Sequence, residues 1–180
     1  GDPHVWFNPR NVMVWVENVE RVMGELVPDE RDAFAAAAHR YEERLAALDA
    51  EISRRVDALP EDRRKLVMDH VSLDHFADRY GFEVIGTVIP STSDQAEPSA
   101  QAVSRLVEVI RREEVPALFV GATAGRGLEN LVTAVADEIG RDIRIGVLLS
   151  GSLAPDGEPG DTYVSFMEYN VTQIVENLAD

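Results

Sequence analysis

The chain after Pro60 alternates short apolar runs with amphipathic stretches, and this alternation constrains the fold more than any other feature. Strands that alternate with helical segments are typical of βαβ units, in which successive strands run parallel and helices cover the sheet. Four units are predicted, with strands 65–69, 83–89, 117–120 and 143–149 and helices 73–80, 99–113, 128–139 and 163–178. The sequence therefore predicts an α/β lobe with a four-stranded parallel sheet flanked by helices.

Two helical stretches precede this predicted lobe. The first begins at Pro9, where Asn8 can cap the helix, and ends near residue 27. The second, residues 29–59, is rich in Ala, Glu, Arg and Leu, and at 1.5 Å per residue it would be a rod of about 45 Å. Its narrow apolar stripe does not keep a heptad, so we expect a rigid strut lying along a globular lobe. The predicted division is 1–27, 28–60 and 61–180.

Two histidines occupy positions that suit a ligand site. His4 lies on a short segment immediately before the first capped helix, and His70 follows the apolar run Leu66-Val67-Met68. In open parallel sheets ligands bind outside the carboxyl ends of the strands, which here are segments 69–72, 90–98, 121–127 and 150–161. Two fixed imidazoles in a chain without cysteine suggest half of a metal site.

Composition excludes some classes of partner. The 180 residues have a formal net charge of -16, whereas binding to nucleic acid or to an anionic membrane surface needs clustered Lys and Arg. No stretch approaches the roughly 20 apolar residues of a membrane span. The length and the 45% hydrophobic content suit one sizeable domain, or one domain plus a remnant of another.

Motifs distributed over nearly the whole chain are shared with one family. They are Asp2-Pro3-His4-Val5-Trp6-Phe7-Asn8-Pro9, the long helical stretch, the His70 segment ending in Phe76-Ala77-Asp78-Arg79-Tyr80-Gly81, Glu97-Pro98-Ser99, Leu118-Phe119-Val120, and Gly160-Asp161-Thr162-Tyr163 with its continuation to Asn170. In their order and separation these motifs resemble those of the zinc and manganese solute-binding proteins of ABC transporters. The resemblance implies two α/β lobes joined by a long rigid helix, with a metal ion held between them. Residues 1–9 would then end an amino-terminal lobe that this chain otherwise lacks, and a membrane tether would also lie outside it.

The resemblance also implies a ligand set. His4 matches the histidine of the family's Asp-Pro-His motif and His70 matches a second ligand position, so both are candidate metal ligands. A further histidine would come from the absent lobe. Asp69 either orients His70 from behind or caps a helix. At two positions where family members have acidic residues this chain has Gly121 and Gly151. Because Zn²⁺ accepts imidazole ligands and Mn²⁺ prefers oxygen, zinc is expected over manganese.

The expected function is capture of a divalent transition metal outside the cytoplasm, in the periplasm or as a cell-surface lipoprotein, and delivery to an ABC permease, without catalysis. One alternative is a receptor-fold protein with a degraded metal site. Another is an α/β enzyme whose glycine-rich segment 121–127 binds a phosphate or nucleotide, although that segment matches neither a P-loop nor the dinucleotide fingerprint.

Each histidine also has an ordinary structural interpretation. His4 could be a helix-entry residue and His70 a buried imidazole satisfied by a carboxylate, whereas His39 and His75 are expected to be surface or packing residues. We expect three aromatic residues to serve packing alone, and these are Trp6, Trp15 and Tyr169.

Overall fold

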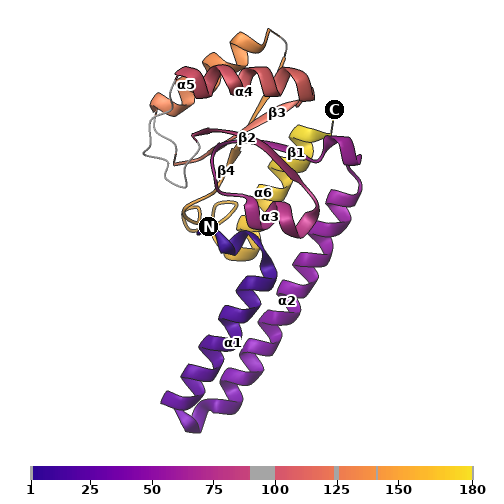
Figure 1. The fold of residues 1–180 in the computed structure, drawn as a ribbon. Helices are drawn as coiled ribbons and strands as arrows, with labels where there is room; N and C mark the ends of the chain where they lie inside the picture. The colour runs from indigo at the N-terminus through magenta and orange to yellow at the C-terminus, as the bar shows by residue number, and fades with distance from the viewer. Residues whose placement is uncertain (1, 90–99, 124–125, 141, 180) are drawn as a thin grey trace.

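The computed structural model describes residues 2–89, 100–123, 126–140 and 142–179. Within them four strands form one parallel sheet in the order β2-β1-β3-β4 (Figure 1). Their bounds are β1 Lys65–His70, β2 Glu83–Ile89, β3 Ala117–Gly121 and β4 Arg144–Leu148. The predicted α/β class and the four-stranded parallel sheet are therefore confirmed. His70 is the last residue of β1, one residue beyond the predicted strand end.

Helices cover both faces of the sheet. On one face α4 (Ala100–Glu113) and α5 (Arg126–Ile139) pack over Val67, Leu118 and Val120. On the other face α3 (Asp74–Tyr80), α6 (Tyr163–Leu178) and part of α2 pack over Leu66, Met68 and Phe119. This alternation along β1 and β3 follows from the two-residue period of a strand, and it produces a three-layer arrangement (Figure 1).

Local signals fix the ends of several helices. Asn8 Oδ1 accepts the Arg10 N–H at 3.0 Å and caps α1 (Pro9–Leu26), as predicted. Gly81 ends α3 with a φ of +74°, a conformation that favours glycine, and its N–H donates to Ala77 O. Thr162 Oγ1 accepts the Ser165 N–H and caps α6, which starts at the predicted residue. The predicted segment 90–98 and the Glu97-Pro98-Ser99 motif lie outside the described residues.

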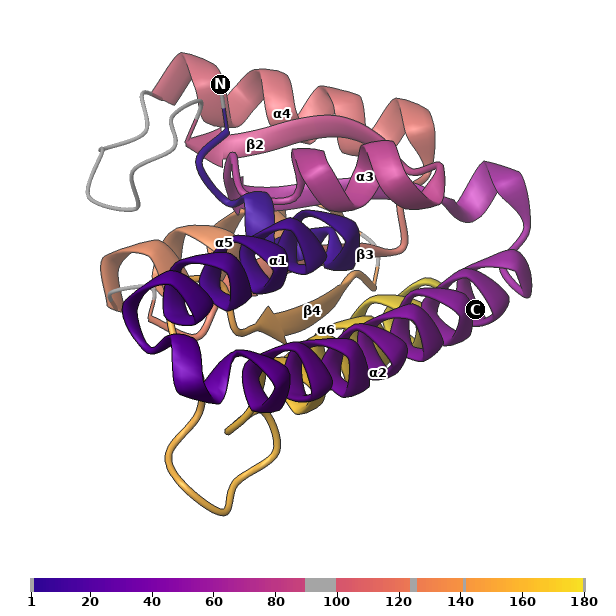
Figure 2. The same cartoon turned by 90° about the horizontal axis from the view of Figure 1, so that it is seen from below.

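The two leading helices form a hairpin. A 3-10 turn, Pro28–Glu30, separates α1 from α2 (Arg31–Asp57), and the helices run side by side away from the sheet (Figures 1 and 2). Only the second half of α2 is buried, through Leu45, Leu48, Ile52 and Val56. The prediction of a strut lying along the lobe is wrong for its first half, because the apolar residues there face α1 instead.

The segment before α1 packs onto the same lobe. Val5–Phe7 form a 3-10 turn, the Phe7 ring lies 5.5 Å from that of Phe166, and the Tyr163 hydroxyl donates to Trp6 O at 2.8 Å. These contacts bring the amino-terminal end of the chain beside the carboxyl edge of the sheet. Among the described residues, no helix combines the length and apolar character needed to cross a bilayer.

Candidate metal centre

His70 lies at the point where the strand order of the sheet reverses. From β1 the chain passes to β2 on one side and then returns to β3 on the other, so the carboxyl ends of β1 and β3 diverge into different crossovers. In open α/β sheets this switch point forms the ligand crevice. His70 is 5% exposed there, which restricts the imidazole to few orientations.

Asp69 contacts His70 from behind. Its Oδ1 lies 2.8 Å from His70 Nδ1 and 2.7 Å from the His70 backbone nitrogen, while Oδ2 accepts the Gly121 N–H at 2.8 Å. The carboxylate thus joins the ends of β1 and β3 and engages Nδ1. A carboxylate that accepts Nδ1–H directs the other ring nitrogen, Nε2, towards a ligand. This arrangement matches the first of the two roles considered for Asp69.

His4 reaches the same crevice from the opposite side, on the segment before α1. It is 8% exposed, and its Nδ1 lies 2.5 Å from Oδ1 of Asp2, whose side chain is 2% exposed. The Trp6 ring packs edge-on against the imidazole at 5.2 Å between centroids. His4 therefore has the same arrangement as His70, an imidazole with a carboxylate behind Nδ1.

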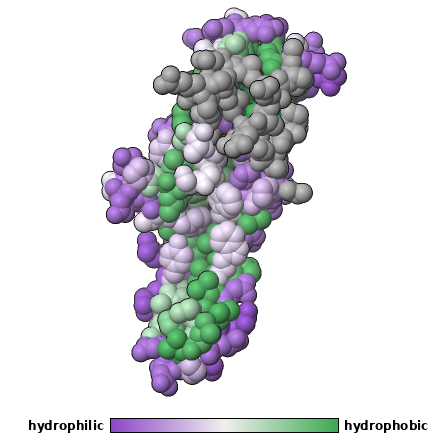
Figure 3. Space-filling model, turned by 90° about the vertical axis from the view of Figure 1, so that its left-hand side faces the viewer, coloured by the Kyte–Doolittle hydropathy of each residue, from purple (hydrophilic) through white to green (hydrophobic). Residues whose placement is uncertain are grey.

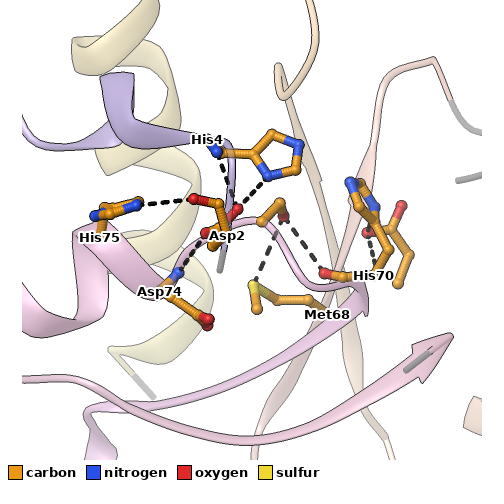
Figure 4. A network of polar contacts seen from close by, with 8 residues as sticks. Asp2, His4, Met68, His70, Asp74 and His75 are labelled. Atoms are coloured by element: carbon orange, nitrogen blue, oxygen red, sulfur yellow. Dashed lines mark hydrogen bonds and ion pairs between the residues drawn. The ribbon is translucent and has the colours of Figure 1, made fainter. Parts of the chain in front are cut away.

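The two imidazoles are close enough to share one cation. Their ring centroids are 5.5 Å apart and their planes are inclined at 64° (Figure 4). A zinc ion lies about 2.0–2.1 Å from an imidazole nitrogen, so two rings that bind it at a tetrahedral angle have centroids about 5 Å apart. The observed separation fits a single bound zinc ion.

A third His, Cys, Asp or Glu side chain is not arranged beside the two imidazoles in the described part of this chain. Within it, no group of three or more His, Cys, Asp or Glu side chains is arranged to hold a metal ion. At Gly121 an added Cβ would lie 2.7 Å from Ser150 Oγ, whereas at Gly151 it would meet nothing within 4 Å. Gly151 lines a pocket of about 220 Å³ together with Trp6, which contacts His4, so position 151 lies near the site.

Two other residues considered in the sequence analysis, His39 and Trp15, are not part of the His4–His70 site. His39 is an exposed residue of α2 whose Nε2 lies 3.6 Å from Glu43, as expected of a surface histidine. Residues 124 and 125 of the glycine-rich segment lie outside the described residues, and the Gly121 N–H is already donated to Asp69. Trp15 was expected to pack; it lines the groove between α1 and α2 and is 46% exposed.

Two residues of the site were missed by the sequence analysis. Asp2 was noted only as part of a motif, although an aspartate two residues before a histidine often bonds back to the local backbone. His75 donates its Nε2–H to Asp2 O at 3.0 Å, although the two residues lie far apart along the chain, and no local pattern indicates this contact.

With the fold and site described, comparison with known proteins identifies the family. Residues 1–177 match the family model ZnuA, described as the periplasmic component A of a zinc-uptake complex. The chain belongs to this family. It is 33% identical over 183 residues to the zinc-binding protein TroA of Treponema pallidum, with 99% of this chain and 58% of TroA covered.

Two further matches agree with this assignment. The manganese-binding lipoprotein MntA of Halalkalibacterium halodurans is 29% identical over 178 residues, covering 99% of this chain and 57% of that protein. The solved structure of the periplasmic zinc-binding protein TroA superposes with a TM-score of 0.88 at 32% identity, over 99% of this chain and 64% of that one. The chain thus spans a little over half the length of the curated relatives that it matches.

Proposed function

We propose that this chain forms one lobe and the linking helices of an extracytoplasmic solute-binding protein, which captures a divalent transition metal for an ABC importer and has no catalytic activity. The observation that carries the proposal is the pairing of His4 and His70 at 5.5 Å, each with a carboxylate on its Nδ1. Carboxylate-backed imidazoles are the usual arrangement of metal-binding histidines.

Zinc is the proposed metal. The relatives named above include both a zinc-binding and a manganese-binding protein, so family membership leaves the choice open. The donors that this chain offers are two imidazoles, with glycine at positions 121 and 151 where acidic residues were expected. Nitrogen donors suit zinc, whereas manganese prefers carboxylate and water oxygens.

The remaining ligands are proposed to come from an amino-terminal lobe of the same protein. The two relatives named above are longer, since the chain covers 57% of MntA and 58% of TroA, and the α1–α2 hairpin offers a surface to cover. Between its helices is an apolar groove of about 400 Å³ whose lining includes Trp15, Val19, Met23, Phe34 and Tyr41. Figure 3 shows hydrophobic side chains gathered on this part of the molecule. An exposed apolar groove of this kind marks an interaction site.

Delivery to a membrane permease and location outside the cytoplasm complete the proposal. Both are supported by family membership and by the relatives, one described as periplasmic and one as a lipoprotein.

Calorimetric titration of the natural full-length protein with Zn²⁺ and with Mn²⁺ tests the metal site. We expect zinc to bind more tightly than manganese, and His70→Ala or His4→Ala to weaken zinc binding by at least 100-fold. His39→Ala is the matched control, because this histidine is exposed on α2 and should leave the affinity unchanged. Wild-type affinity in His70→Ala contradicts the proposed site. A wild-type protein that binds neither metal favours instead a receptor fold with a degraded site, the alternative suggested by Gly121 and Gly151.

A further inference from the structure

Asp2 makes more contacts than its position beside the amino-terminal end of the chain would suggest. Its Oδ1 accepts the backbone N–H of His4 at 3.0 Å and lies 2.5 Å from His4 Nδ1, and its Oδ2 accepts the N–H of Asp74 at 3.2 Å. Its backbone oxygen lies 3.0 Å from His75 Nε2. Figure 4 shows Asp2 between His4 on one side and the start of α3, with Asp74 and His75, on the other.

We infer that Asp2 is a positioning residue for the metal site, which selects the tautomer of His4 and fastens it to α3, with His75 holding Asp2 in place. The inference deepens the proposed function and rests on it for the metal, but its structural part concerns the metal-free protein. Neither Asp2 nor His75 is proposed as a metal ligand.

The first part of the inference concerns the tautomer. A neutral imidazole carries its proton on one nitrogen, and the other nitrogen has the lone pair that a metal needs. The Asp2 carboxylate is an acceptor only, so at 2.5 Å it favours the proton on Nδ1 of His4 and the lone pair on Nε2. Because the Asp2 side chain is 2% exposed, water cannot easily replace this interaction when the carboxylate is removed.

The second part concerns the position of the imidazole. The side chain of Leu73, the N-cap of α3, makes no capping bond, and Asp2 supplies an acceptor for the first helical N–H instead. A carboxylate at a helix N-terminus also interacts favourably with the helix dipole. Since α3 follows β1 within a few residues, this contact fixes His4 relative to the strand end that carries His70.

His4 and His70 differ in what this positioning requires. Asp69 is the chain neighbour of His70, so its contact is local, and the strand already fixes both residues. His4 precedes α1, which is not part of the sheet. The pairing of the His4 and His70 rings therefore depends on contacts between distant parts of the chain. The Phe7 and Trp6 contacts hold the segment on the lobe, and those of Asp2 with Asp74 and His75 hold the part that carries His4 itself. Loss of the Asp2 contacts should therefore disturb His4 and leave His70 in place.

The tautomer is tested by ¹⁵N NMR of the metal-free, natural full-length protein with labelled histidine, the His4 signal being assigned from its loss in His4→Gln. We expect the Nδ1–H form in the wild type and a shift towards the Nε2–H form in Asp2→Ala. Asp29→Asn, at the exposed far end of the hairpin, is the control and should change nothing. A wild-type tautomer in Asp2→Ala overturns the inference, whether or not the protein binds zinc.

Zinc affinity and thermal unfolding of the same variants separate positioning from general stability. Removing a carboxylate behind a ligand histidine costs about 10–100-fold in metal affinity, and we expect this for Asp2→Ala. His75→Ala should lose several-fold, and His75→Gln should recover the loss because its amide N–H can donate to Asp2 O. The two His75 variants test the inference even if Asp2→Ala fails to fold. Unchanged affinity in both alanine variants, or a loss that His75→Gln does not recover, overturns the inference.

Discussion

The two halves of α2 contrast sharply, although they belong to one continuous helix. In the second half Leu45, Leu48, Ile52 and Val56 are between 0 and 4% exposed, and the last three join the core beneath the sheet. In the first half Phe34 and Tyr41 are only partly buried and line an open groove between α2 and α1. A helical apolar stripe therefore shows that a face is to be buried, but it does not show by what.

A charged cluster lies within the buried half of α2. Asp49 of α2 is 7% exposed, and Arg79 of α3 donates to it through Nε at 2.9 Å and Nη2 at 2.5 Å. Tyr80 donates its hydroxyl at 2.9 Å, and Arg10 of α1 lies at 3.3 Å. Three helices thus meet at one carboxylate. The cluster fixes the angle at which the hairpin leaves the lobe.

The largest effect should come from truncating the buried half of α2. We expect Ile52→Ala to lower the free energy of unfolding of the 180-residue chain by about 3 kcal/mol, since it leaves a cavity in a packed core. Phe34→Ala, its counterpart in the open half, should cost less than about 1 kcal/mol in the same chain. Urea denaturation measures both. Equal losses of stability in Ile52→Ala and Phe34→Ala would show that the two halves of α2 are packed alike.

A smaller, pH-dependent effect is expected at Asp49. Burial acts to raise the pKa of Asp49, but hydrogen bonds from Arg79, Tyr80 and Arg10 and the charge of Arg79 outweigh it and lower the pKa. A lowered folded-state pKa stabilises the fold above the unfolded pKa of about 3.9, and this stabilisation is lost as the pH falls through the folded value.

Asp49→Asn should therefore lower the free energy of unfolding by about 2 kcal/mol near neutral pH, because the buried carboxylate that pairs with Arg79 is lost. The stability difference between wild type and variant should hold from pH 7 to 5 and shrink below about pH 4. Glu51→Gln, which removes an exposed partner of Arg54, is the control and should show no measurable change. A stability difference between wild type and Asp49→Asn that grows as the pH falls would contradict a lowered pKa of Asp49.

The smallest effect on this chain should come from Trp15→Lys in the groove. Trp15 is 46% exposed, so the change should alter the unfolding free energy by no more than about 0.5 kcal/mol. At natural full length the same change should be clearly destabilising, if the amino-terminal lobe covers the groove. Val14→Lys is matched in exposure but lies outside the groove lining, and it should be tolerated in both. If the 180-residue chain and the full-length protein tolerate Trp15→Lys equally well, the proposal that an amino-terminal lobe covers the groove is wrong.

Periodicity predicted the sheet and most helix ends because those features depend on neighbouring residues. Asn8, Gly81 and Thr162 act at the helix ends through contacts within a few residues, and each is visible in the sequence. The course of α2 was only half predicted, because the surface that buries a stripe comes from distant segments. Asp49 illustrates this limit, since its partners Arg10 and Arg79 lie far from it along the chain.

The site divides in the same way. His70 and Asp69 could be placed from one strand and its end, whereas the distance between His4 and His70 depends on how the segment before α1 packs. The family resemblance paired the two histidines before any geometry was known. It did not indicate His75, because the contact of that residue with Asp2 comes from the packing of α3.

The surroundings of Gly121 and Gly151 bear on how readily the metal preference of the proposed receptor can be altered. A Cβ added at Gly151 meets nothing within 4 Å, so a single substitution there could add an oxygen donor from the loop. At Gly121 an added Cβ would lie 2.7 Å from the Ser150 hydroxyl, which would have to move, and 3.4 Å from the Asp69 carboxylate. Laboratory selection for manganese uptake should therefore find its first gain at residue 151.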